Sequence, residues 1–153
     1  MRQGDVALLQ DPVAKRLLES AIPARLAYVW TDGTPRVVPI NFHWNGREIV
    51  LTTTPNAPKL KALRNGSKVA LTIDETGFPP GVLLLRGSVT IDTVDGLPPE
   101  SIAAAQRYFG EEQSKAWVER ARQFVTQSVR VAIHPELVGL FDFQTRFPST
   151  AVG

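Results

Sequence analysis

A row of hydroxyl groups followed by two lysines is the part of the chain best suited to binding chemistry. Thr52, Thr53 and Thr54 end an apolar run. Lys59 and Lys61 follow after a short loop, in the first turns of an expected helix. Hydroxyls can donate hydrogen bonds, a lysine adds a compact positive charge, and the start of a helix favours an anion. These residues predict a site for a phosphate or another polyanion.

The same basic residues also fit a second, structural interpretation. Lys61 and Arg64 lie opposite Leu60 and Leu63 at helical spacing, as they would on an ordinary solvent-exposed face. Lys59 lies on the flank beside the threonines, where spacing alone favours an anion contact and solvent exposure equally. The pattern is suggestive of the anion site without being specific for it.

Two strands and a short helix are expected to position these groups. The β-branched and apolar run 47–54 predicts a half-buried strand, and 68–74 predicts another. Between them, Asn56 can cap a helix, Pro58 suits its first turn, and Gly66 can end it.

A hairpin formed by the runs 24–31 and 36–44 is expected to lie beside this unit. On its second strand the predicted core face comprises Val38, Ile40, Phe42 and Trp44, and the other face comprises Val37, Pro39, Asn41 and His43. Pro39 cannot donate to a β-ladder, which predicts an edge, a bulge, or a place where a ligand replaces the neighbouring strand. Asn41 could bond either a heterocycle or a loop backbone.

The remaining segments predict peripheral helices and further strands of one domain spanning 1–153. A helix over 12–20, within the N-terminal segment 1–22, reads as a lid or strap capped by Asp11. A long strand is predicted over 82–93, apolar on both faces at its start. The helical insertion 98–127 is broken at Gly110, and its predicted buried residues are Leu97, Ile102, Ala105, Phe109, Trp117 and Phe124.

Two last strands, 129–134 and 138–143, are expected to flank Pro135. The tail, 145–153, is predicted to be disordered or laid over a partner. About seven strands with short early connections predict a mainly β architecture: an antiparallel barrel, closed or partly closed, with helices at its periphery.

Composition limits the classes of function. The chain has 153 residues, 43% of them hydrophobic and 21% charged, and no cysteine. Its longest apolar run is too short to span a bilayer and its N-terminus lacks a secretory pattern, so we expect a cytoplasmic protein without membrane partners. Two histidines and no thiolate argue against a metal site. The net charge of +2 is dispersed, which does not indicate nucleic-acid binding.

Conventional catalytic motifs are missing, so the sequence identifies no catalytic residues. There is no Gly-rich phosphate loop, no G-x-S-x-G and no evident pair of acids. His43 could be a general base and His134 an anion partner, although polar residues at strand ends more often have no such role. Trp30, Trp44 and Trp117 fit core or interface positions better than substrate stacking.

The run PRVVPINFHWNGREIVLTTTPNAPKLKALRNGSKVALTID, followed by LLLRGSVTI, resembles the pyridoxamine 5′-phosphate oxidase-like superfamily of split β-barrels. This resemblance implies a six- to seven-stranded antiparallel split barrel and a homodimer with two cofactor sites at its interface. It also implies that a strand end and the following helix hold the cofactor phosphate, and that the ring lies along the second strand. The positions that match phosphate contacts are Thr52, Thr53, Lys59 and Lys61, and those that match the ring-edge strand are Val37, Val38, Pro39 and Asn41.

The chain departs from the founding enzyme of that superfamily at three places. Asn41 stands where that enzyme has lysine, Pro58 stands where it has arginine, and its Arg-x-His signature near the C-terminus is missing. The sequence is more similar to a branch whose members use FMN or the 8-hydroxy-5-deazaflavin coenzyme. The leading hypothesis is therefore a flavin- or deazaflavin-dependent oxidoreductase that moves a hydride to or from a small organic substrate. A non-catalytic flavin carrier or sensor is the alternative, and a barrel that binds single-stranded nucleic acid ranks last.

Overall fold

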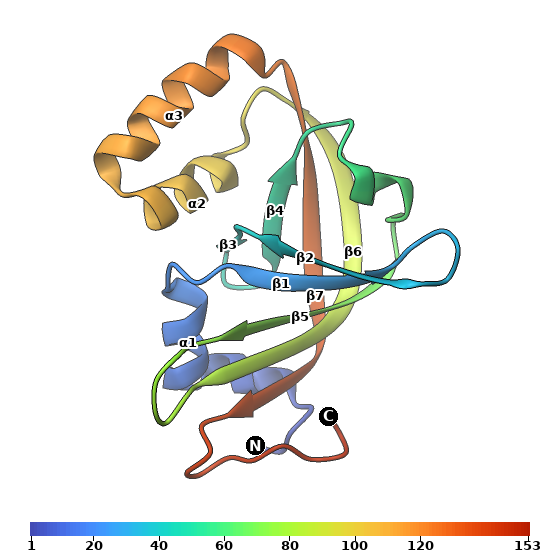
Figure 1. Cartoon of the computed structure of the whole chain (residues 1–153), viewed down its shortest axis with the longest axis vertical. Helices are drawn as coiled ribbons and strands as arrows, with labels where there is room; N and C mark the ends of the chain where they lie inside the picture. Colours follow the sequence, from blue (N-terminus) through green and yellow to red (C-terminus); the bar gives the residue numbers. More distant parts are fainter.

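Seven strands and three α-helices make up the fold, and the computed structural model describes all 153 residues (Figure 1). The strands are β1 (Ala24–Val29), β2 (Pro35–Ile40), β3 (His43–Trp44), β4 (Ile49–Thr53), β5 (Lys68–Asp74), β6 (Val82–Asp95) and β7 (Gln127–Phe141). The helices are α1 (Pro12–Glu19), α2 (Pro99–Phe109) and α3 (Glu111–Phe124), with two 3₁₀ helices, η1 (Val6–Gln10) and η2 (Pro58–Lys61). The expected mainly β class with peripheral helices is confirmed.

One antiparallel sheet runs in the order β2-β1-β5-β6-β7-β4-β3, so β2 and β3 are its two edges. These edge strands follow each other in the chain with only Asn41 and Phe42 between them. The sheet must therefore curl until its edges meet at this linker, although no ladder joins β2 to β4. The result is the expected split barrel.

The expected single strand over 36–44 is wrong, because the chain changes partner at Asn41. Before this residue β2 pairs with β1, and after it β3 pairs with β4 at only two positions. Phe42 is fully buried at the change of direction. Because β3 begins only at His43, which pairs with Val50, there is no strand partner on that side of β4 for Leu51, Thr52 and Thr53.

The two strands expected around Pro135 form one continuous strand, β7. A bulge between Arg86 and Gly87 of β6 shifts the register opposite Pro135, where the missing N–H can be accommodated. Gly87 is needed there, because a Cβ atom would lie 2.0 Å from the carbonyl oxygen of His134.

The helix expected after β4 is only the short 3₁₀ helix η2. Its N-cap position is Ala57 and carries no side-chain cap bond, so the expected cap at Asn56 is wrong. Leu63 is buried, as the spacing predicts.

The α1 helix matches its sequence pattern closely. Asp11 is its N-cap and accepts a hydrogen bond from the Val13 amide at 2.9 Å. Leu17 and Leu18 are buried within the main hydrophobic cluster, which the strands fill from the other side. The helix thus covers the core, as expected of a lid.

The helical insertion folds as the hairpin α2–α3, but its expected burial is partly wrong. Ala105 is buried, whereas Phe109 and Trp117 are exposed by 41% and 40% and Phe124 by 74%. The same chain therefore covers these aromatic side chains only in part. Figure 1 shows the hairpin at the edge of the fold beside β4.

The C-terminal tail packs on its own chain, so the expected disorder is wrong, and the expected contact with a partner stays a prediction. Val152 is buried, and its side chain lies 3.0 Å from where a Cβ atom on Gly139 would be. Arg146 donates to Asp11 at 3.1 Å and so ties the tail to the start of α1.

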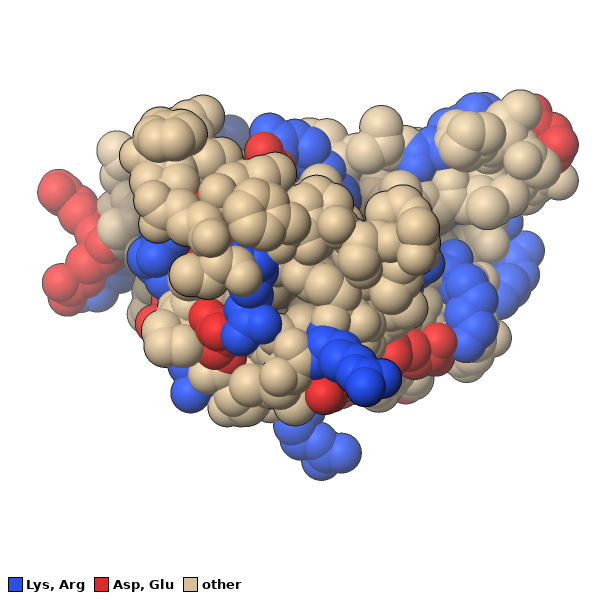
Figure 2. Space-filling model, turned by 90° about the horizontal axis from the view of Figure 1, so that it is seen from below, with Lys and Arg blue, Asp and Glu red and all other residues tan.

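Charge is dispersed over the face of the molecule at which the two termini lie. Figure 2, which views the molecule from the end where both termini lie, shows basic and acidic side chains interspersed over a largely uncharged face. None of the helices combines the length and the apolar character that crossing a membrane requires.

Candidate functional site

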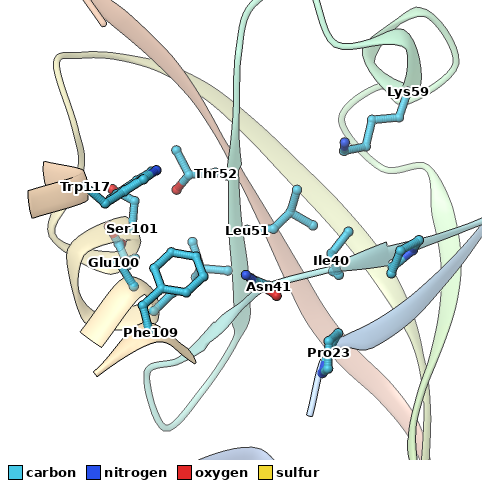
Figure 3. A pocket seen from close by; sticks show the side chains of 14 residues that line it. Pro23, Ile40, Asn41, Leu51, Thr52, Lys59, Glu100, Ser101, Phe109 and Trp117 are labelled. Carbon is cyan, nitrogen blue, oxygen red and sulfur yellow. The ribbon is translucent and has the colours of Figure 1, made fainter. Parts of the chain in front are cut away.

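A cavity of about 430 Å³ lies where the sheet is split. Its walls come from residues 39–41 at the end of β2, residues 50–52 of β4, Lys59 of η2, and the α2–α3 hairpin (Figure 3). This volume lies within the range of small-molecule sites, roughly 300–1,000 Å³. The cavity therefore sits at the one place where a β4 edge lacks a neighbouring strand.

The open edge of β4 divides this cavity into two ends. Because side chains alternate along a strand, Thr52 and Leu51 point to opposite sides. Figure 3 shows Thr52 directed toward Ser101 and Trp117, whereas Lys59 approaches β4 from the other side. A ligand in the cavity would lie across the strand edge, within reach of backbone groups that no strand bonds.

Lys59 lines one end and has no acidic partner. The salt bridges of the structure involve other cations, such as Arg16, Arg25 and Arg130, and none includes Lys59. Burial lowers the pKa of its ammonium group below the ordinary value. A half-buried cation without a counter-charge fits a bound anion such as a phosphate, which would supply the missing compensation.

Thr52 provides a second unsatisfied group in the wall. Its hydroxyl oxygen, Oγ1, is buried and has no hydrogen-bond partner. Buried polar groups are nearly always bonded, so an unpaired one in a cavity indicates a place for a ligand or water atom. Thr52 and Lys59 thus both suit a polar ligand, from opposite sides of β4.

An ion-pair network supports the α2 end of the cavity. Arg130 of β7 donates to Glu100 Oε1 at 2.7 Å and lies 3.8 Å from Glu48 Oε1. His134 Nδ1 lies 3.0 Å from Glu48 Oε2. Burial raises the pKa of Glu100, but the hydrogen bond and charge of Arg130 outweigh this effect, so the pKa stays below its ordinary value. Glu100 is therefore a carboxylate held ionised in the cavity wall.

The cavity brings together only some of the residues suggested by the sequence. Those in its lining are Pro39, Asn41, Thr52 and Lys59, and those outside it are Val37, Val38, Thr53, Thr54 and Lys61. Val37, Thr54 and Lys61 are exposed, and Val38 and Thr53 are half-buried. Neither His43 nor His134 lines the cavity. Cofactor contact by any of these residues stays a prediction.

Sequence reasoning missed the wall contributed by α2–α3. Glu100, Ser101, Phe109 and Trp117 all line the cavity, and both aromatic residues were expected to be buried. Their apolar character says nothing about whether a partner surface is present. The closing of the hairpin over β4 depends on contacts between segments distant in the sequence, which no local pattern reveals.

The family model for pyridoxamine 5′-phosphate oxidase matches residues 11–138. The chain belongs to this family. The match includes β1 to β6, the hairpin and most of β7, and so covers every segment that lines the cavity. The resemblance of residues 35–74 to this superfamily is thereby confirmed.

Solved structures with the same fold differ in what their names state. An F420 reductase is 25% identical, with a TM-score of 0.62 over 82% of this chain and 94% of that chain. A conserved hypothetical protein from Mycobacterium tuberculosis is 19% identical, with a TM-score of 0.70 over 100% and 98% of the two chains. HutZ, the heme storage protein from Vibrio cholerae, is 19% identical, with a TM-score of 0.59 over 86% and 93%. The search among curated proteins gave no match.

Proposed function

We propose that this protein is a flavin- or deazaflavin-dependent oxidoreductase, with FMN as the first candidate and the 8-hydroxy-5-deazaflavin coenzyme as the second. The observation that carries the proposal is the cavity at the split of the barrel, with the unpaired cation Lys59 in its wall. Family membership and the similarity to an F420 reductase support the same class. The departures at Asn41 and Pro58 argue against pyridoxamine phosphate oxidation as its reaction.

The cavity residues suit the parts of such a coenzyme. Lys59 would hold the phosphate, and Pro39 and Asn41 would lie along the ring, beside the β4 edge that lacks a strand partner. When bound, the ring supplies the redox chemistry by accepting or giving up a hydride. The protein groups then bind, orient and exclude water, which explains why no conventional catalytic set is needed.

A heme-binding role is less well supported, even though HutZ shares the fold. Protein heme iron is usually held by His, Cys, Met or Tyr. None of these residue types lines the cavity. The polar groups that do line it suit a phosphate and a heterocycle better than a metal centre.

A homodimer is part of the proposal. Val29 and Val37 are exposed by 59% and 66% on neighbouring strands β1 and β2, and the cavity begins at the end of β2. Exposed apolar residues on one sheet face favour burial by a second subunit. Sedimentation at micromolar concentration should therefore give a dimer, and a monomer would refute this part.

The proposal is tested by titrating the coenzyme-free protein with FMN and, in parallel, with the deazaflavin coenzyme. Lys59→Ala should weaken binding by about 1.5–3 kcal/mol, the range for a charge-assisted hydrogen bond. Lys15→Ala is the control, because Lys15 is an exposed lysine on α1 that does not line the cavity. Binding of neither coenzyme, or equal losses for the two variants, would overturn the assignment.

A further inference from the structure

The two ends of the cavity differ in chemistry. The Lys59 end presents a cation, and the opposite end presents the side chains of α2–α3 (Figure 3). Four residues define this second end: Glu100, Ser101, Phe109 and Trp117. A single anionic ligand would match the first end only.

Two aromatic rings form an uncovered wall at the α2–α3 end. Phe109 and Trp117 lie with ring centroids 6.2 Å apart and planes tilted by 60°. Both remain substantially exposed, while Ala104 and Ala105 on the same side of α2 are small and leave space. Exposed aromatic faces beside small residues favour a flat, largely apolar occupant.

The polar atoms at this end are mainly acceptors. The Ser101 hydroxyl already donates to the Pro98 carbonyl at 2.8 Å, so it can only accept from a ligand. Glu100 accepts from Arg130 and from no other side chain. The unpaired Thr52 hydroxyl can donate or accept. A matching ligand therefore has to bring hydrogen-bond donors.

Arg130 does not use up the acceptor capacity of Glu100. The guanidinium is shared between Glu100 and Glu48, so two carboxylates face one cation. An ionised carboxylate has about four acceptor sites. Arg107, the cation of α2, donates to the carbonyl oxygens of Ser20 and Phe42 and does not line the cavity.

We propose that the α2–α3 end of the cavity is a second subsite, which binds the reactant that meets the coenzyme: a flat organic molecule that presents an N–H or O–H donor to Glu100. Phe109 and Trp117 supply the stacking wall, and Glu100 selects for the donor. The assignment to a reactant rests on the proposed function. The preference for a ligand with hydrogen-bond donors follows from the acceptor groups of Glu100 and Ser101 and does not depend on the proposed function.

Benzamidine and benzoate are suitable probes, because they share a flat shape and differ in presenting donors or acceptors. Saturation-transfer NMR should measure both, on coenzyme-free protein and on protein saturated with the coenzyme that it binds. On the coenzyme-saturated protein we expect benzamidine to bind, and benzoate to bind at least about tenfold more weakly. The coenzyme is needed in this comparison because its phosphate occupies Lys59, which could otherwise bind benzoate.

Glu100→Gln should reduce this preference for benzamidine by about tenfold, since it removes the charge from the hydrogen bond. Glu112→Gln is the matched control, because Glu112 is an exposed acid on α3 that does not line the cavity. Trp117→Ala should weaken both probes about equally, with Phe124→Ala as its control on the same helix. The affinity for the coenzyme should stay unchanged in the two subsite variants.

The outcomes separate the subsite from the proposed function. A preference that survives Glu100→Gln would overturn the subsite, and so would competition between benzamidine and the coenzyme, which would place the coenzyme itself at this end. Flat titrations together with dissociation of the dimer in Trp117→Ala would also overturn it, by making the aromatic wall a subunit contact. A donor preference that persists while neither coenzyme binds would support the subsite and refute the oxidoreductase.

Discussion

Two helical regions cover the sheet, and they are attached in opposite ways. The N-terminal η1 and α1 bury Leu8, Leu17 and Leu18 almost completely in the main core. The α2–α3 hairpin leaves Phe109 and Trp117 exposed above the cavity. The apolar face of η1 and α1 is covered by the same chain, whereas the aromatic side chains of α2–α3 remain partly exposed.

The hairpin is attached to the barrel by directional polar contacts in addition to the ring contact between Phe42 and Tyr108. The Arg107 guanidinium donates to the carbonyls of Ser20 and Phe42 and lies 4.8 Å and 4.7 Å from the ring centres of Phe42 and Tyr108. Tyr108 donates to the Ile22 carbonyl at 3.1 Å. Such directional contacts can hold a helix over a cavity without filling it. The comparison therefore separates a helix that stabilises the fold from a hairpin that shapes a site.

The largest effect is expected for Leu17→Ala in α1. Removing a fully buried leucine side chain should cost about 2–5 kcal/mol of unfolding free energy. Urea unfolding measures this loss, and coenzyme affinity in the folded protein should not change, because α1 does not line the cavity. Lys15→Ala, at an exposed position of α1, is the control. A loss below about 1 kcal/mol would mean that α1 is not the structural element described above.

Arg107→Met should have an intermediate effect that is concentrated in the hairpin. It leaves two part-buried carbonyls without their charged donor, at a cost of about 1.5–3 kcal/mol. Hydrogen exchange should become faster in α2–α3 and stay unchanged in α1. The exposed Arg120→Met on α3 serves as the comparison, since Arg120 has no side-chain partner. If hydrogen exchange became faster by the same factor in α1 and in α2–α3, Arg107 would not act specifically on the hairpin.

The burial of α1 was predictable from the sequence, and that of the α2–α3 hairpin was not. Asp11, Pro12 and the leucines of α1 follow local rules of capping and periodicity, and the structure agrees with them. The faces of the longer strands also follow from alternation, as Val69, Leu71 and Ile73 illustrate. Local rules suffice here because each element buries the face that its own pattern marks.

The candidate site depends on meetings between distant segments. Thr52 and Lys59 could be selected from their types, but their positions on opposite sides of β4 follow from the split of the sheet. The pairing of Glu100 with Arg130 joins residues on α2 and β7. Phe109 was expected to be buried because the apolar pattern marks burial without saying whether a covering surface exists. Tertiary geometry decided all three cases.

The smallest effect, and the one with the opposite sign, is expected for Thr52→Val beneath the hairpin. The valine keeps the β-branched shape suited to β4 and removes a buried hydroxyl that has no partner. An unpaired buried hydroxyl costs about 1–3 kcal/mol, of which the substitution should recover roughly 1 kcal/mol in the ligand-free protein. Thr93→Val, at an exposed position of β6, should change stability by less than about 0.5 kcal/mol.

A gain in stability at Thr52 combined with weaker benzamidine binding would identify the hydroxyl as a group kept for a ligand. Stabilisation of a ligand-free protein at the expense of binding is the usual sign that a position serves function rather than folding. A loss of stability would instead mean that water or the backbone satisfies the hydroxyl in solution. In that case every buried polar group under α2–α3 has a partner. The only remaining difference between this hairpin and α1 is then the exposed pair of Phe109 and Trp117.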